Sequence, residues 1–169
     1  SRIVGSSVKG MMLQVNEKLE IKDFSGTAGL YSAVLPVDRS KVVLERIADL
    51  VGVWYDSDEF HCTLMYSPTT PSKLPEPRGG TFTAKMSGLA IYGDEKKVLV
   101  VTLESAELQK EHSRLLGYGC KHTFDPYSPH VTLGKVPEGF DESAHADVND
   151  AIKGGTLWFN NQQFSDLVP

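Results

Sequence analysis

Cysteine is scarce in this sequence, and long apolar runs are missing. Only Cys62 and Cys120 occur among 169 residues, which is too few for a disulfide framework, and their spacing is not that of a metal site. No apolar stretch approaches the roughly 18 residues needed to span a membrane. The first residues also have no apolar region typical of a secretory signal. These absences predict a cytoplasmic protein with no membrane contact.

A basic surface is missing as well. The chain has 17 Lys and Arg against 22 Asp and Glu, a formal net charge of −5, and its positive residues are scattered. A protein that follows a long phosphate backbone normally has a basic stripe. The charge pattern therefore excludes a general binder of long nucleic acid. It leaves open a small nucleotide, whose few charges can be met inside a pocket.

The composition that is present fits one globular domain. A chain of this length usually forms a single domain with its own core, and 40% hydrophobic with 23% charged residues is ordinary for that class. We assign this domain to residues 21–169. Residues 1–20 are expected to be a flexible N-terminal segment or a cloning remnant.

Hydrophobic periodicity predicts alternating strands and helices. Strands are expected at 29–37, 59–66, 130–136 and 156–164, with a hairpin over 81–104 that turns at Gly93-Asp94. Helices are expected at 39–52, 106–119 and 141–155. Asp38 or Ser40 is expected to cap the first helix. The proline-rich stretch 67–80 reads as a surface loop that could close over a site, with Lys73 and Arg78 bringing positive charge.

One eight-residue pattern occurs twice. "HCTLMYSP" (His61–Pro68) and "HVTLGKVP" (His130–Pro137) both read H-x-T-L-x-x-x-P. Side chains alternate between the faces of a strand, so each histidine shares a face with the threonine two residues later. The residues between them, such as Cys62, then point into the core.

The paired side chains suit phosphodiester chemistry. Imidazole exchanges protons near neutral pH, so a neutral His61 and a protonated His130, or the reverse, can serve as general base and general acid. The hydroxyls of Thr63 and Thr132 can donate hydrogen bonds to phosphate oxygens. A lone histidine on a strand is more often structural, but two copies of the whole pattern are hard to ascribe to chance.

Three other readings of these residues were considered. Cys62 as a catalytic thiol is less favoured than Cys62 as a buried hydrophobe. A zinc site would need a third ligand, from Asp58, Glu59 or Asp125, and none of these repeats between the motifs. A serine hydrolase lacks its G-x-S-x-G turn. The remaining histidines, His112, His122 and His145, are expected to be exposed, and His122 is the one candidate among them for the pocket.

The two motifs resemble the two-histidine (2H) phosphoesterase superfamily, whose signature is a pair of H-x-[ST]-hydrophobic tetrapeptides. His61–Leu64 and His130–Leu133 match it in full, and the element order agrees over residues 29–160. The resemblance implies an α+β, pseudo-symmetric, two-lobed LigT-like fold, with antiparallel sheets and flanking helices around a central cleft. It implies metal-independent cleavage of a phosphodiester without a cofactor, with His61, Thr63, His130 and Thr132 as the catalytic residues.

The stretches "GLYSAVLPVD" and "DEFHCTLMYSP" are similar to the phage anti-CBASS phosphodiesterases. That resemblance implies a cyclic di- or trinucleotide messenger such as cGAMP as substrate, cleavage of its 3′–5′ bonds, and action in the host cytoplasm. Tyr31, Tyr127 and Trp158 are candidates for stacking on its bases, an interaction worth roughly 1–3 kcal/mol per base. We expect a monomer or a weak homo-oligomer.

Two alternatives stay open at this stage. One is another member activity of the superfamily, an RNA-end 2′,3′-cyclic phosphodiesterase or a 2′–5′ oligonucleotide phosphodiesterase. The other is a module that sequesters a cyclic nucleotide without turnover. The intact His-Thr pairs favour catalysis, because a binder needs no proton-transfer groups.

Overall fold

The computed structural model describes residues 19–124 and 126–169, whose strands join in one antiparallel sheet. The strands are β1 (Glu20–Asp23), β2 (Gly29–Pro36), β3 (Cys62–Ser67), β4 (Phe82–Tyr92), β5 (Val98–Glu104), β6 (His130–Lys135) and β7 (Thr156–Val168). Their order across the sheet is β1-β7-β2-β3-β6-β5-β4, and β4 also pairs with β7. The predicted α+β class is confirmed.

The long strand β7 ties the two halves of the sheet together. Its first residues pair with β4, from Thr156 opposite Lys85 to Phe159 opposite Phe82. Its last residues pair with β1 and β2. At the other junction, between β3 and β6, the register is a single residue pair. Each motif strand is otherwise paired within its own half, β3 with β2 and β6 with β5.

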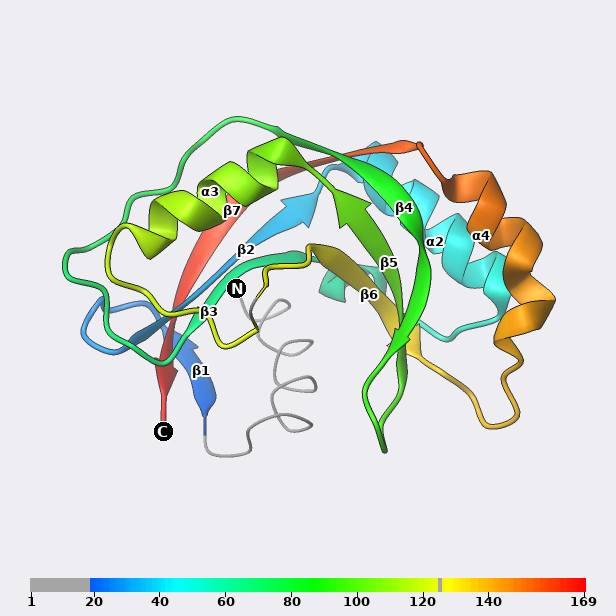
Figure 1. Cartoon of the computed structure of the whole chain (residues 1–169), viewed down its shortest axis with the longest axis horizontal. Coiled ribbons are helices and arrows are strands. Elements are labelled where there is room, and N and C mark those ends of the chain that lie inside the picture. The colour runs from blue at the N-terminus through cyan, green and yellow to red at the C-terminus, as the bar shows by residue number, and fades with distance from the viewer. Residues whose placement is uncertain (1–18, 125) are drawn as a thin grey trace.

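Helices cover the outside of this arched sheet (Figure 1). They are α2 (Asp38–Val51), α3 (Ala106–Leu116) and α4 (Ala146–Ile152), with single 3₁₀ turns at η1 (Ser57–Glu59) and η2 (Glu142–His145). The α3 helix packs on β3 and β4, α4 on β4, and α2 on β2, β6 and β7. In the part of the chain that is described, no helix is long and apolar enough to cross a membrane.

The main core lies between these helices and the sheet. It contains Cys62, Leu64, Val131 and Leu133, the alternate residues of the two motifs, so the predicted face of each motif strand is confirmed. A smaller cluster built on Tyr31, Ala33, Tyr66 and Leu167 is separate from this core.

Most elements are found where the sequence predicts them, with five differences. The predicted helix at 141–155 is instead the 3₁₀ turn η2 followed by the shorter helix α4. The second predicted strand begins later, at Cys62, because residues 57–59 form η1. The α2 helix has no side-chain cap; Val37 precedes it, and the Ser40 hydroxyl instead accepts the Trp158 amide. The last strand continues to Val168, and β1 is an additional strand.

The predicted domain boundary at residue 21 falls one residue inside β1. The expected N-terminal segment, apart from Leu19 and Glu20, lies outside the described residues.

Candidate active site

The two motifs meet at the junction of the halves. Cys62 and Val131 are direct partners in the antiparallel β3–β6 pair. Because the strands are antiparallel, His61 lies on the same side of this single pair as Thr132, and Thr63 lies on the same side as His130. Since neighbours along a strand alternate faces, all four side chains project from the face opposite the main core. The repeat thus builds one site, with a pseudo-twofold axis between its two central residues.

Each imidazole is oriented by a hydrogen bond to the backbone carbonyl two residues before it. The Nδ1 atom of His61 lies 2.7 Å from the Glu59 carbonyl oxygen, and that of His130 lies 2.9 Å from the Ser128 carbonyl oxygen. A carbonyl only accepts, so each Nδ1 carries a proton and donates it. Nε2 is then the acceptor nitrogen of each neutral ring, ready to take a proton.

Burial shifts the proton affinity of both rings. Loss of solvation lowers the pKa of His61 to about 4; the Glu59 carbonyl opposes this shift, and the nearby His130 adds to it. Burial also lowers the pKa of His130, against the opposing effect of the Ser128 carbonyl. Both rings are therefore neutral at pH 7 without a ligand. The influence of His130 on His61 shows that the two rings are electrostatically coupled.

Two tyrosines hold Thr63. The Tyr31 hydroxyl lies 3.0 Å from Thr63 Oγ1, and the Tyr127 hydroxyl donates a 2.6 Å hydrogen bond to the Thr63 carbonyl. Burial raises the pKa of both tyrosines well above the ordinary value, so both hydroxyls keep their protons. Tyr31 is only 1% exposed, and its ring offers no open face for a base. Thr63 is fixed at its side chain and at its backbone.

A cluster of rings lies against β3, beyond its residue pair with β6. The Tyr127 ring stacks on His112 with centroids 4.3 Å apart, and His112 Nδ1 donates to the Leu64 carbonyl at 2.6 Å. His122 Nδ1 accepts the Tyr66 amide at 3.0 Å. These side chains bond to β3 backbone groups on the stretch beyond the single residue pair with β6. The prediction that His112 is exposed is wrong, because it is 5% exposed.

The second motif has a neighbour that the sequence analysis missed. The Tyr92 ring, at the end of β4, and the His130 ring are steeply inclined to each other, with centroids 4.9 Å apart. Burial raises the pKa of Tyr92, which keeps its hydroxyl protonated. The residue precedes a Gly-Asp turn, and no local pattern marks it as part of a site. His145, also expected to be exposed, is partly buried and stacks on Phe140.

The other predicted binding residues lie on different elements. Trp158 is partly buried on β7, with the Arg39 guanidinium 4.0 Å above its ring. The proline-rich loop is tied to the α3 side: Ser72 N donates to the Tyr118 carbonyl, and Lys73 lies over the Tyr118 ring. Arg78 covers the Phe82 ring at 4.0 Å. The basic side chains of this loop are thus engaged beside α3.

The structure also bears on the two alternatives of a catalytic thiol and a metal site. Cys62 is buried, and loss of solvation raises the pKa of its thiol to about 12, so it carries no reactive thiolate. Over residues 19–124 and 126–169, no group of three or more His, Cys, Asp or Glu could hold a metal ion. Of the third ligands considered, Asp58 pairs with Lys41 at 2.8 Å, and Asp125 lies outside the described residues.

Comparison with known proteins adds to this geometry. The "Anti-CBASS protein Acb1" family model matches residues 28–161. The anti-CBASS protein Acb1 of Enterobacteria phage T4 is 31% identical over 119 residues, which cover 68% of this chain and 76% of that protein. The Acb1 protein of Vibrio phage KVP40 is 27% identical over 120 residues, covering 68% and 78%.

A solved crystal structure, that of TT0787 of Thermus thermophilus, aligns over 83% of this chain and 87% of that one, with a TM-score of 0.42 and 16% identity. The match to the family model spans both motifs and most of the sheet. The predicted resemblance to phage anti-CBASS proteins is confirmed, and the chain belongs to the anti-CBASS protein Acb1 family.

Proposed function

We propose that this protein is a metal-independent phosphodiesterase that cleaves the 3′–5′ bonds of cyclic di- and trinucleotide messengers and so counters CBASS immunity. The observation that carries the proposal is the Cys62–Val131 pair. This pair supports a site in which two imidazoles and two hydroxyls share one face, and each imidazole is hydrogen-bonded to the backbone carbonyl two residues before it.

The arrangement supplies what a phosphodiester transfer requires. One imidazole removes the proton from the ribose 2′-hydroxyl, whose oxygen attacks phosphorus. The bond from phosphorus to the 5′-oxygen breaks, and the other imidazole, protonated at the start, gives its proton to that oxygen. Thr63 and Thr132 hydrogen-bond the non-bridging oxygens as their charge grows. The product is a linear nucleotide ending in a 2′,3′-cyclic phosphate, which water can open in a second step.

The lowered pKa values fit an anionic substrate. Without substrate both rings are neutral, whereas catalysis needs one proton on the pair. A phosphate bound between the rings favours that proton, since opposite charge stabilises the protonated form. The active protonation state is thus favoured when substrate is present. The acidic net charge of the chain also suits a short cyclic nucleotide better than a long RNA.

A substrate panel in the presence of EDTA tests this function. It contains cyclic di- and trinucleotides, 2′,3′-cyclic mononucleotides, and short linear 2′–5′ and 3′–5′ oligonucleotides, with the products identified by mass spectrometry. We expect the cyclic di- and trinucleotides to be opened and the linear strands to be poor substrates. Preference for the linear strands or for the 2′,3′-cyclic mononucleotides would favour the RNA-processing alternatives. Binding without turnover would favour sequestration, and loss of activity in EDTA would favour a metal enzyme.

A further inference from the structure

Two adjacent polar residues of α3, Glu111 and His112, are buried, with exposed fractions of 2% and 5%. Buried polar groups are costly unless they are hydrogen-bonded, and these two side chains bond to different strands. Glu111 accepts from Gln162 of β7, and His112 donates to the Leu64 carbonyl of β3. Because β2 lies between β7 and β3, the helix is held across three neighbouring strands.

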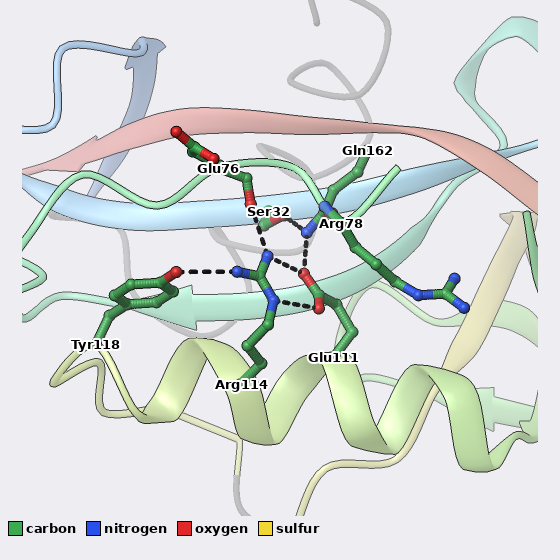
Figure 2. A network of polar contacts seen from close by, with 7 residues as sticks. All are labelled: Ser32, Glu76, Arg78, Glu111, Arg114, Tyr118 and Gln162. Atoms are coloured by element: carbon green, nitrogen blue, oxygen red, sulfur yellow. Dashed lines mark hydrogen bonds and ion pairs between the residues drawn. The ribbon is translucent and has the colours of Figure 1, made fainter. Parts of the chain in front are cut away.

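The contacts of Glu111 form a buried network on the β7 side (Figure 2). Gln162, at a bulge of β7 where the β2–β7 register shifts, donates from Nε2 to Glu111 at 2.7 Å and to Ser32 Oγ at 3.2 Å. Its Oε1 accepts the Arg78 amide at 2.7 Å. Arg114 donates two hydrogen bonds to the Glu111 carboxylate, at 2.6 and 2.7 Å. This network fixes α3 against β7 and β2, and its members lie outside the two motifs.

His112 connects the same helix to the first motif. Its Nδ1 atom donates to the Leu64 carbonyl at 2.6 Å. Its ring lies flat on the Tyr127 ring, with centroids 4.3 Å apart and planes inclined by 9°. The Tyr127 hydroxyl donates in turn to the Thr63 carbonyl at 2.6 Å. His112 therefore contacts one β3 carbonyl directly and, through Tyr127, the carbonyl just before it.

Tyr127 is held by α3 at its ring and at its backbone. Gln109 Nε2 donates to the Tyr127 carbonyl at 3.1 Å. Helix residues three positions apart are neighbours on the helix surface, so Gln109 and His112 hold Tyr127 from one side of α3. The ring of His122, which is partly buried rather than exposed, meets Tyr127 at a steep angle with centroids 5.7 Å apart. These contacts fix where the Tyr127 hydroxyl meets β3.

The contacts converge on Thr63. The Tyr31 hydroxyl lies 3.0 Å from its side-chain oxygen, and the Tyr127 hydroxyl bonds to its carbonyl. A hydrogen-bond donor stabilises developing charge only when it lies about 2.7–3.1 Å from the oxygen that carries the charge. A misplacement of about 1 Å can lower a rate about 10²-fold. The position of the β3 backbone at Thr63 therefore matters for the proposed reaction.

We propose that His112 is a positioning residue, whose ring holds the Tyr127 hydroxyl on β3 and so sets the Thr63 hydroxyl against the substrate phosphate. The proposal rests on the proposed function, which assigns Thr63 to the phosphate. The hydrogen bond from His112 to Leu64 has a separate role, because it stabilises the docking of α3 on β3. The helix α3 thus contributes to catalysis, although it carries no motif residue.

Two substitutions of His112 separate these roles, with kcat, KM and the melting temperature measured on a cyclic dinucleotide. His112→Asn removes the ring and keeps an N–H donor near the place of Nδ1, whereas His112→Phe keeps the ring and removes the donor. We expect His112→Asn to lower kcat about fivefold, the worth of one hydrogen bond, with KM changed less than about twofold. His112→Phe should keep kcat within about twofold and lower the melting temperature, because the Leu64 carbonyl loses this donor.

A double variant shows whether His112 acts through Tyr127. Tyr127→Phe has already lost the hydroxyl, so adding His112→Asn to it should lower kcat no further. Glu111→Gln is the matched control, since it removes the carboxylate that pairs with Arg114 and weakens the other anchor of the same helix. It should lower the melting temperature and change kcat less than about twofold.

Four results would overturn the proposal: an unchanged kcat in His112→Asn, an equal fall of kcat in His112→Phe, an equal fall in Glu111→Gln, or losses that multiply in the double variant. An equal fall in Glu111→Gln would assign His112 a purely structural role. If His112→Phe does not fold, the double variant decides, because asparagine keeps the buried hydrogen bond.

If the wild-type chain opens no cyclic nucleotide, the proposed function fails, and the positioning is judged without turnover. The Tyr127 hydroxyl proton is then followed by NMR, since its hydrogen bond to Thr63 slows its exchange with water. Loss of this signal in His112→Asn but not in His112→Phe supports the role of the ring. A signal that persists in His112→Asn, or is lost in both variants, overturns it.

Discussion

The first and second motif strands carry the same residues at the same spacing but differ in their surroundings. His61 is 4% exposed, and Thr63 is held by two tyrosine hydroxyls. His130 is partly exposed, and its ring meets that of Tyr92 in an edge-to-face contact. Both histidines nevertheless make the same Nδ1 contact to a carbonyl two residues earlier.

The comparison separates what the chemistry requires from what the fold supplies. The shared parts are the ring orientation and the His-Thr spacing, which the proposed reaction needs on both sides of a phosphate. The surroundings differ because the neighbouring tyrosines come from different elements. Those at the first motif come from β2 and from the loop before β6, and the one at the second motif comes from β4. The histidine of the first motif is therefore the more deeply buried of the two. The predictions below compare the two halves, beginning with the largest effect.

Replacing either histidine should have the largest effect, and a similar one in both halves. His61→Ala and His130→Ala are each expected to lower kcat/KM for a cyclic dinucleotide by about 10²–10⁴, the range for loss of a general acid or base. Binding should persist, as judged by calorimetry. A loss confined to one histidine would show that the equal ring contacts do not reflect equal roles.

Acid should destabilise the first half more than the second. A pKa of about 4 for His61 in the folded chain, against about 6.5 when unfolded, means that the unfolded chain binds the proton more readily. Stability is then full above pH 6.5 and falls as the pH drops toward 4, by about 3 kcal/mol for this one residue. Denaturant unfolding across this range measures it. His61→Gln should flatten the dependence more than His130→Gln does, and an equal effect would contradict the difference in burial.

Removing one threonine hydroxyl should cost less than removing an imidazole. Thr63→Val and Thr132→Val are each expected to lower kcat about 10- to 100-fold, because a donor to the developing charge is lost. Thr63→Val also breaks the contact to Tyr31, so it should lower the melting temperature as well. Unchanged kcat in both variants would remove the hydroxyls from the mechanism.

The smallest effect is expected from Tyr127, whose hydroxyl contacts the backbone of the first motif. Tyr127→Phe removes the hydrogen bond to the Thr63 carbonyl and keeps the ring on His112. We expect kcat to fall about fivefold, the worth of one hydrogen bond, with KM nearly unchanged. Tyr92→Phe, in the other half, is the matched control and should have no effect on kcat. A larger loss of kcat in Tyr92→Phe than in Tyr127→Phe would contradict this difference between the two halves.

Local sequence patterns predicted most of the elements and the strand face that the four motif residues share. The repeat could be read because its geometry is local: strand alternation alone puts histidine and threonine on one face. The pairing of Cys62 with Val131 could not be predicted, because it depends on the register between strands far apart in the sequence. The short, charged β1 and the β7 bulge have no local signature either.

The burial of His112 could have been predicted from the sequence. Leu108, His112 and Leu115 are spaced by four and three residues, so they share one helix face, and all three are buried. Polar neighbours along the chain suggested exposure instead. An imidazole on an apolar face would have predicted a buried, hydrogen-bonded ring. One predicted base platform, Tyr31, was correctly placed on a strand, but burial beside Thr63 gives its hydroxyl a structural contact.

The central claim is that the two motifs form a single catalytic unit, and a double-mutant cycle in EDTA tests it most directly. kcat/KM for a cyclic dinucleotide is compared for the wild-type chain, His61→Ala, His130→Ala and the double variant. Residues that act as one unit are strongly non-additive, so the double variant should be about as impaired as the worse single variant. Losses that multiply in the double variant, or near-normal turnover by either single variant, would contradict the claim.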